Sequence, residues 1–454
     1  MEVFAAFVAH TDHEIGRFIQ SVKEGPHADN TLILYIVGDN GDETSGGING
    51  ADNLGARFSG TDLSIKDQLQ HMDELGGPLH TNIYAAAWAW AGSTPFQWVK
   101  HVASHFGGTR NPLVVSWPAR IKDHGGLRSQ FTHVNDVAAT LCDLAGIKFP
   151  EVVDGVKQLP LDGVSFVDSF NHADAPSRHR VQYFEAEGNR AIYQDGWLAA
   201  ARHTVPWILQ PPNTDFSHDR WELYHVTDDF SQAHDVAAQN PDELKALQSL
   251  FDAEARKNDV YPLGAGTEVR SPLWSEGKRE FIYYAGFPGL ALVGGPDFQS
   301  SHRITANVVI PANGVEGVVI ASGSREGGFS LYVKNNHLVY ENNFLGRGRD
   351  VITSNETVPI GQVELRYEFV REGIQRPQGS QTFDPLKSAG SHGGGTGRLY
   401  LNGRLVGERK LAHVELNSFG GVDIGQNSPS PVSQAYQPPF KFTGTIEKVQ
   451  MDLK

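Results

Sequence analysis

Asp39 and Asn40 carry the residue types that most directly suggest chemistry in this sequence. They form a Gly-Asp-Asn-Gly turn directly after the apolar run Thr31–Gly38. Carboxylate and amide oxygens are the hard ligands that Ca²⁺ prefers, so the turn is a candidate metal site. The same four residues are also common turn chemistry, and from spacing alone a plain turn is the simpler interpretation.

Lys100 is a second candidate, because it precedes the glycine-rich turn Gly107-Gly108. A lysine ammonium is a compact charge that can contact phosphate-like or sulfate-like groups. An exposed helix surface followed by a turn would give the same pattern. The nearby His101 and His105 are interpreted as structural.

The elements around these residues predict an α/β architecture. Residues 1–25 have apolar residues at helical spacing, and Thr31–Gly38 and Asn111–Ile121 are apolar runs typical of strands. His133–Ile147 has helical periodicity and ends near Gly146. We expect the first run to be buried on both faces of an open parallel sheet, with its ligand sites beyond the carboxyl ends of the strands.

The rest of the chain predicts two further regions and a linker. Residues 181–262 alternate like antiparallel strands and end in a helix, which indicates a small α+β subdomain, and 263–279 is interpreted as a linker. Residues 280–454 predict a β-sandwich of jelly-roll type, with a hairpin at Asn402-Gly403 and a mobile loop over 371–398. The predicted sandwich strands are HRITANVVI, VEGVVIASG, FSLYVKN, HLVYENNF, VELRYEFV, GRLYLNGRLVGERK and IEKVQMDLK.

Composition narrows the classes of partner. The 454 residues include 38 Lys+Arg and 53 Asp+Glu, a formal charge of −15, which disfavours nucleic acid and anionic membranes as partners. The single cysteine, Cys142, excludes intramolecular disulfides and multi-thiolate metal sites, and its helical apolar surroundings predict a core position. Zinc held by His and carboxylates stays open. No signal peptide or membrane-spanning run is apparent, so a cytoplasmic location is the default expectation.

Several ordered segments resemble the formylglycine-dependent sulfatases, in particular the bacterial and fungal arylsulfatase branch. They are TLILYIVGDNG, then GGPLHTNIYAAAWAWAGSTPFQWVKHVASHFGGTRNPLVVSWPARI, then FTHVNDVAATLCDLAGIKFPEVVDG and PLDGVSF. The resemblance continues in RWELYHVTDDFSQAHDVAAQNPDEL and in YQPPFKFTGTIEKVQMDL, and so reaches across nearly the whole chain. It implies a fold of the alkaline phosphatase superfamily.

The resemblance also implies a reaction and a site. Sulfatases of this family hydrolyse sulfate esters, with Ca²⁺ holding the sulfate group while a hydrated formylglycine attacks sulfur. By resemblance, Asp39 and Asn40 would be two of the Ca²⁺ ligands and Lys100 would contact the sulfate. The aromatic residues of the same segment would line an aryl pocket or pack in a core; they are Trp88, Trp90, Phe96 and Trp98.

One family feature is missing before the Asp39 turn. The family nucleophile belongs to a Cys/Ser-x-Pro-x-Arg signature, which does not occur in the first 38 residues, and Asp174–Arg178 has Asp in place of Cys or Ser. We therefore expect residues 1–180 to be the carboxyl-terminal portion of a sulfatase α/β domain that is truncated at its amino terminus. Ca²⁺ would be held weakly or be absent, and the isolated chain would have little or no activity.

Two other functions stay open. The sandwich could be a carbohydrate-binding module attached to a pseudoenzyme, or the chain could act on phosphonate or phosphate monoesters within the same superfamily. For the sulfatase interpretation the expected partner is a small-molecule or glycan sulfate ester. The sequence does not indicate an oligomeric state.

Overall fold

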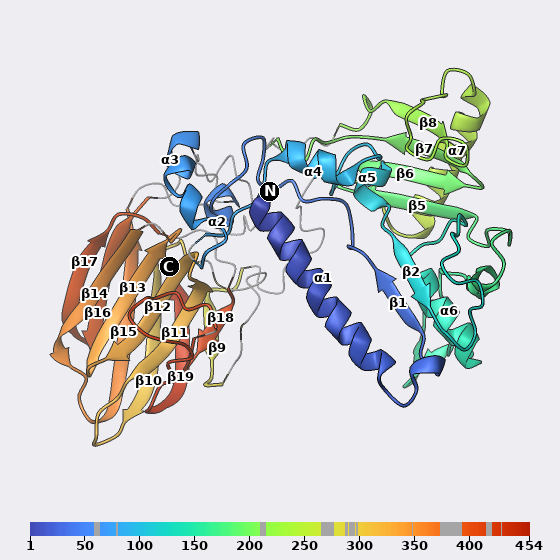
Figure 1. Cartoon of the computed structure of the whole chain (residues 1–454). Coiled ribbons are helices and arrows are strands. Elements are labelled where there is room, and N and C mark those ends of the chain that lie inside the picture. Colours follow the sequence, from blue (N-terminus) through green and yellow to red (C-terminus); the bar gives the residue numbers. More distant parts are fainter. Residues whose placement is uncertain are drawn as a thin grey trace. The chain divides into compact units, whose positions relative to one another are not determined.

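The computed structural model shows two compact units (Figure 1). It describes residues 1–58, 64–78, 80–208, 215–264, 277–286, 289, 296, 298–346, 348–372, 393–414, 420–427 and 429–454. Unit 1 is built from Met1–Thr44, Tyr84–Ile208 and Pro212–Gly266, and unit 2 from Ser45–Ile83, Leu209–Pro211 and Thr267–Lys454. The division into 1–180, 181–262, 263–279 and 280–454 stays a prediction, and most of the predicted linker lies outside the described residues.

Unit 1 begins with the predicted long helix, α1 (Glu2–Lys23), which has no buried residue. Its other helices are α4, α5, α6 and α7, with 3₁₀ turns at η1 and η3. Their bounds are α4 Ala86–Ser93, α5 Phe106–Thr109, α6 Asp136–Ala145, α7 Pro241–Lys257, η1 Ala28–Asn30 and η3 Val167–Phe170. Among the described residues, no helix combines the length and the apolar character needed to cross a bilayer.

The first sheet of unit 1 differs from the prediction in the relative direction of its strands and in the number of its faces that are buried. Strands β1 (Ile33–Ile36) and β2 (Leu113–Ser116) are present where expected, but they pair antiparallel. Leu113 and Val115 face a core with Trp117, whereas Val114 on the other face is 53% exposed. The expectation of a parallel strand buried on both faces was wrong, because a short apolar run does not reveal how many faces its neighbours cover.

Cys142 also differs from its predicted position. It lies in α6 and is half-buried, whereas the fully buried positions of that helix are Asp136 and Thr140. The helical apolar pattern located the helix but overstated the burial of this side chain.

The antiparallel region of unit 1 is a four-stranded sheet in the order β5-β6-β7-β8, packed against α7. Its strands are β5 Val181–Ala186, β6 Asn189–Gln194, β7 Trp197–Ala201 and β8 Trp221–His225. Ile192 and Leu223 of the sheet share a core with Leu247 and Phe251 of α7. This arrangement confirms the strands and the helix predicted here. A short ladder, β3 (Val152–Val153) with β4 (Val156–Lys157), completes the strands of unit 1.

Unit 2 contains the predicted β-sandwich. Its six-stranded sheet, in the order β17-β16-β15-β10-β19-β9, has the bounds β9 Glu280–Tyr283, β10 His302–Ile310, β15 Gly361–Arg371, β16 Gly395–Leu401, β17 Arg404–Leu411 and β19 Thr445–Leu453. Its five-stranded sheet, in the order β14-β13-β12-β11-β18, has the bounds β11 Gly317–Ser324, β12 Gly327–Lys334, β13 His337–Phe344, β14 Gly348–Thr357 and β18 Val422–Ile424. Both sheets contribute to one apolar core, with Ile304 and Tyr367 from the first and Leu331 and Tyr340 from the second.

Two details of the sandwich were predicted. The hairpin between β16 and β17 turns at Asn402 and Gly403, whose φ angles of 46° and 78° are those of a left-handed turn. The predicted mobile loop over 371–398 lies largely outside the described residues, and its described ends were predicted wrongly, because Arg371 ends β15 and Gly395–Arg398 belong to β16. Strands β9, β14 and β18 are additional to the predicted set. The predicted fold class, α/β followed by an all-β sandwich, is confirmed.

Residues Ser45–Ile83 also belong to unit 2. They form α2 (Leu54–Phe58), α3 (Ile65–Gln70) and the 3₁₀ turn η2 (Met72–Glu74). The side chain of Asn53 donates a hydrogen bond to the carbonyl oxygen of Leu345 (2.8 Å), which ties this segment to the sandwich.

Candidate functional site

The Asp39 turn is fixed by close backbone packing against the segment that carries Lys100. The Gly41 N–H donates to the carbonyl oxygen of Gly108 (3.1 Å). A Cβ atom at Gly41 would lie 1.7 Å from the Gly107 carbonyl oxygen, so no larger residue fits here without a backbone shift. Glycines on both segments therefore allow two loops that are far apart in sequence to meet.

Lys100 is held beside the turn by two contacts. Its backbone N–H donates to the Asp42 carbonyl oxygen (3.2 Å), and its Nζ donates to Oε2 of Glu43 (2.6 Å). The side chains of Lys100 and Glu43 are 33% and 32% exposed. The ammonium group is thus reachable from solvent, although a carboxylate already occupies one side of it.

Asn40 has a fixed backbone, whereas Asp39 points into solvent. The side-chain amide of Asn111 faces Asn40 with its oxygen 2.9 Å from the Asn40 N–H and its nitrogen 3.2 Å from the Asn40 carbonyl oxygen. Asn40 is half-buried and Asp39 is exposed. The structure therefore brings the turn that carries both predicted metal ligands next to Lys100.

Asp42 is a further acidic residue of the turn, and the sequence pattern did not single it out. Burial raises the pKa of its carboxyl group. The Asp42 N–H donates to Oγ of Ser93 (3.4 Å), and a Cβ atom at Gly92 would lie 1.6 Å from Asp42 Oδ2. Burial and the charge of Asp42 raise the pKa of Tyr84 to about 12. Asp42 is therefore packed against α4 and is not directed at Lys100.

His101 and His105 make contacts that support a structural role. His105 Nε2 lies 3.2 Å from Glu222 Oε2, and its Nδ1 lies 2.9 Å from Ser104 Oγ, with the ring almost fully buried. The hydrogen bond to Glu187 raises the pKa of His101. Both imidazoles thus connect the Lys100 segment to neighbouring residues of unit 1.

The aromatic residues near Lys100 divide into packed rings and one exposed ring. Trp98 stacks on Trp207 with ring centroids 5.7 Å apart and meets Trp90 edge to face at 5.2 Å. Phe96 packs against Phe106, with centroids 6.0 Å apart. Trp88, by contrast, is 53% exposed. Packing thus accounts for Trp90, Phe96 and Trp98.

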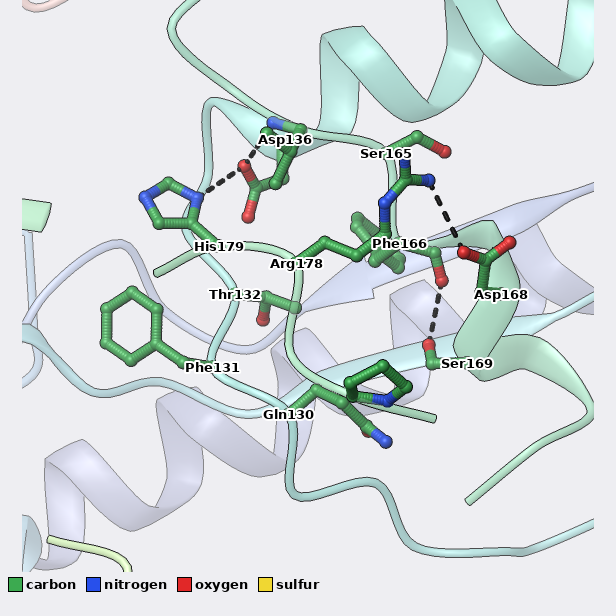
Figure 2. A pocket seen from close by; sticks show the side chains of 12 residues that line it. Gln130, Phe131, Thr132, Asp136, Ser165, Phe166, Asp168, Ser169, Arg178 and His179 are labelled. Atoms are coloured by element: carbon green, nitrogen blue, oxygen red, sulfur yellow. Dashed lines mark hydrogen bonds and ion pairs between the residues drawn. The ribbon is translucent and has the colours of Figure 1, made fainter. Parts of the chain in front are cut away.

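A separate pocket of unit 1 lies beside the α6 amino terminus and is shown in Figure 2. Asp136 Oδ1 lies 2.7 Å from His179 Nδ1, while the two carboxylate oxygens accept backbone N–H groups of His133 and Val164, each at 2.8 Å. Burial raises the pKa of Asp136, but these hydrogen bonds outweigh it and hold the pKa below its usual value. Burial lowers the pKa of His179, but the hydrogen bond to Asp136 outweighs burial and raises the pKa above its usual value. This pair anchors the helix terminus.

The segment Asp174–Arg178 borders the same pocket through Pro176 and Arg178. The Ser177 hydroxyl donates to the carbonyl oxygens of Phe131 and His179, both at 3.2 Å. Arg178 lies 3.4 Å from Asp168. These contacts are those of a structural loop.

The Ser-x-Pro-x-Arg pattern occurs at Ser116-Trp117-Pro118-Ala119-Arg120. The expectation drawn from the first 38 residues missed it, because that expectation concerned the residues before the Asp39 turn. In the antiparallel ladder Ser116 pairs with Ile33, whereas Leu113 pairs with Ile36, the last residue of β1. At about 3.4 Å per residue, three positions place Ser116 roughly 10 Å along the strand from the end that leads into the Asp39 turn. The ladder geometry therefore separates this serine from the candidate site.

Comparison with known proteins shows what the amino-terminal part of the chain is similar to. The sequence model of the sulfatase family matches residues 1–147, which include Asp39, Asn40 and Lys100. Residues 1–147 are thus similar to a sulfatase domain. The predicted resemblance to sulfatases is confirmed for the segment that carries the candidate site.

Three relatives extend the sulfatase comparison. An uncharacterized sulfatase of Schizosaccharomyces pombe is 28% identical over 254 residues, which cover 54% of this chain and 42% of the relative. An arylsulfatase of Klebsiella aerogenes is 28% identical over 188 residues, 41% of this chain and 37% of the relative. An N-acetylgalactosamine-6-O-sulfatase of Bacteroides thetaiotaomicron is 22% identical over 247 residues, 54% of this chain and 40% of the relative. The chain thus spans less than half the length of each of these sulfatases.

The Ca²⁺ ion that the sulfatase resemblance implies has only part of its ligand set here. Asp39 and Asn40 offer oxygen donors of the right type, but Ca²⁺ takes six to eight oxygens. Glu43 is bound to Lys100, and Asp42 packs against α4. Within the described residues, the turn alone therefore does not fit a complete Ca²⁺ shell.

Proposed function

We propose that this chain acts on sulfate esters, as part of a sulfuric ester hydrolase of the arylsulfatase type. The observation that supports this most directly is the sulfatase match over residues 1–147, in which the Asp39 turn lies against the Lys100 segment. The substrate class is a small-molecule or glycan sulfate ester.

In this proposal Lys100 contacts the sulfate group. Its ammonium is partly exposed and now donates to Glu43, a carboxylate that occupies a position a sulfate oxygen would take. Asp39 and Asn40 are proposed as two of the ligands of a Ca²⁺ ion, which in sulfatases offsets the negative charge of the sulfate. With so few oxygen donors at the turn, Ca²⁺ is held weakly or is absent in the isolated chain.

The second part of the proposal concerns the formylglycine nucleophile, which the described residues do not supply. Its cysteine lies in α6, Ser177 is bound to two carbonyl oxygens, and Ser116 lies at the far end of the β1–β2 ladder. We therefore propose that the isolated chain has little or no turnover while keeping an anion-binding contact at Lys100.

The test measures binding of para-nitrophenyl sulfate by calorimetry. Lys100→Met should abolish binding that the unmodified chain shows, while Lys245→Met, which removes an exposed lysine of α7, should leave it unchanged. Glu43→Gln should tighten binding about fivefold, because removing one like charge near 4 Å changes the free energy by about 1 kcal/mol even in water.

Three results would contradict parts of the proposal. Equal binding by Lys100→Met would exclude Lys100 as the sulfate contact. Preference for para-nitrophenyl phosphate over the sulfate would favour the phosphate-ester alternative. Hydrolysis of the aryl sulfate by the unmodified chain, lost in Asp39→Ala, would show that the isolated chain has a working site.

A further inference from the structure

His71, Glu74 and His80 form a side-chain cluster in unit 2 that the sulfatase proposal does not use. His71 follows α3 and Glu74 is the last residue of η2, so the two are three positions apart on one helical turn and lie on the same side. His80 comes from the segment that follows. Among the described residues, these three are the group of His, Cys, Asp or Glu whose ligand atoms meet within 4.8 Å of one another.

The distances in the cluster suit a small metal ion. His80 Nε2 lies 3.0 Å and His71 Nδ1 lies 3.8 Å from the same carboxylate oxygen, Glu74 Oε2. Ligands about 2.0–2.2 Å from a tetrahedral Zn²⁺ are roughly 3.3–3.6 Å apart, which falls between these two values. The two imidazole rings are 5.0 Å apart, centroid to centroid. The ligand atoms all lie within 4.8 Å of one another, so modest side-chain rotation would bring all three to one ion.

Burial adds an independent reason. Nδ1 of His71 is shielded from solvent and makes no hydrogen bond. Its nearest acceptor, Glu74 Oε2, is 3.8 Å away, so the shielded nitrogen keeps a desolvation cost that a metal ion at this position would remove. His80 is 10% exposed and Glu74 is 55% exposed. The His71 side chain is 43% exposed, so its shielded Nδ1 and the largely buried His80 face the cluster, and the carboxylate faces solvent that can supply a further ligand.

The backbone holds the cluster in shape. Ser64 Oγ accepts the Asp67 N–H (3.1 Å) and caps the start of α3. After η2, the Gly77 N–H donates to the Glu74 carbonyl oxygen (3.0 Å) and the His80 N–H donates to the Gly77 carbonyl oxygen (3.4 Å). This tight turn returns His80 to Glu74.

The same segment is attached to the sandwich within unit 2. Arg325, in the turn between β11 and β12, donates to the carbonyl oxygen of Pro78 (2.6 Å). This hydrogen bond holds the tight turn that precedes His80.

We propose that His71, Glu74 and His80 bind one Zn²⁺ ion, with water completing its coordination. Two imidazoles and one carboxylate are a known ligand set for Zn²⁺, whereas Ca²⁺ prefers oxygen ligands only. The ion would connect η2 to the residues after the tight turn and so stabilise the segment Ser45–Ile83. This site is separate from the Asp39 turn, which belongs to unit 1.

The experiment titrates ZnCl₂ into the full chain, prepared without a polyhistidine tag and stripped of metal, and follows the heat of binding. We expect one Zn²⁺ per chain. His71→Ala and His80→Ala should each weaken binding by at least about tenfold, since even residues that only support a metal ligand change affinity 10–100-fold. The matched control is His218→Ala, because His218 lies 3.5 Å from Asp215 at the same three-residue spacing but belongs to no three-ligand group among the described residues.

A second readout guards against misfolded variants. Glu74→Gln keeps the size and hydrogen-bonding capacity of the side chain but removes its charge, and it should lose Zn²⁺ affinity while its circular dichroism without metal stays unchanged. Co²⁺ bound to the unmodified chain should show visible absorption that His80→Ala lacks. The proposal would be overturned if the unmodified chain did not bind Zn²⁺. It would also be overturned if all three ligand variants bound Zn²⁺ as tightly as the unmodified chain. Neither readout involves sulfate, so the result is independent of the proposed hydrolase function.

Discussion

Asp136 and His179 form a buried ion pair whose protonation affects the stability of unit 1. Their side chains are 1% and 5% exposed, and the carboxylate also accepts two backbone N–H groups. The folded state therefore favours ionised Asp136 and protonated His179, which lowers the pKa of the first and raises the pKa of the second. Removing one partner of such a pair typically costs about 3–5 kcal/mol.

The direction of both shifts predicts a pH window for stability. The contribution of His179 is complete below its usual pKa of 6.5 and is lost as pH rises through its higher folded value. The contribution of Asp136 is complete above its usual 3.8 and is lost as pH falls through its lower folded value. We expect the pair to stabilise most between those two usual values.

Urea unfolding at mildly acidic and mildly alkaline pH measures this contribution. The free energy of unfolding should fall less toward alkaline pH for His179→Gln than for the unmodified chain. The control His218→Gln should not change that loss. If His179→Gln lost as much stability at alkaline pH as the unmodified chain, the assignment would be refuted.

At the scale of elements, the pattern of side chains predicted most of the described strands and helices of the two antiparallel regions. Strands such as β10 alternate buried and half-buried positions, and this period-two signal is local to the sequence. The pairing of β1 with β2 could not be predicted in the same way, because 76 residues separate Ile36 from Leu113 and a short apolar run fits either direction. Direction is decided by which segments pack together.

Two glycines give a matched test of an element and of a turn. Gly16 lies inside α1, and a Cβ atom there would have nothing within 4 Å, so Gly16→Ala should stabilise the chain by about 0.5–1 kcal/mol through helix propensity. Gly41→Ala would place its Cβ 1.7 Å from a backbone oxygen and should destabilise by about 1–3 kcal/mol or more. Chemical denaturation of both variants measures the difference. Similar stability of the two would contradict the close packing of the Asp39 turn.

At the scale of the whole molecule, the chain has two compact units with separate apolar cores. The α7 core of unit 1 contains Leu247, and the sandwich core of unit 2 contains Ile304, both fully buried. Because no core residue is shared between these clusters, each unit has its own source of hydrophobic stabilisation.

Calorimetric unfolding should therefore show two transitions. Leu247→Ala should lower the midpoint of one and Ile304→Ala the midpoint of the other, since each removes buried methyl groups at a cost of about 2–5 kcal/mol. If the Zn²⁺ site is present, ZnCl₂ should raise only the transition that Ile304→Ala lowers. A single transition, shifted equally by both variants, would mean that the two units unfold cooperatively.

The sequence by itself determined the resemblance of the amino-terminal part to sulfatases, the hairpin at Asn402-Gly403 and the candidate residues Asp39, Asn40 and Lys100. These follow from ordered motifs, turn chemistry and local periodicity, all of which are contained in neighbouring residues. Only the tertiary structure decided that Glu43 neutralises Lys100, that Ser116 is distant from the Asp39 turn, and that His71, Glu74 and His80 meet. Such contacts depend on how the backbone folds between residues, and short sequence spacing does not specify that path.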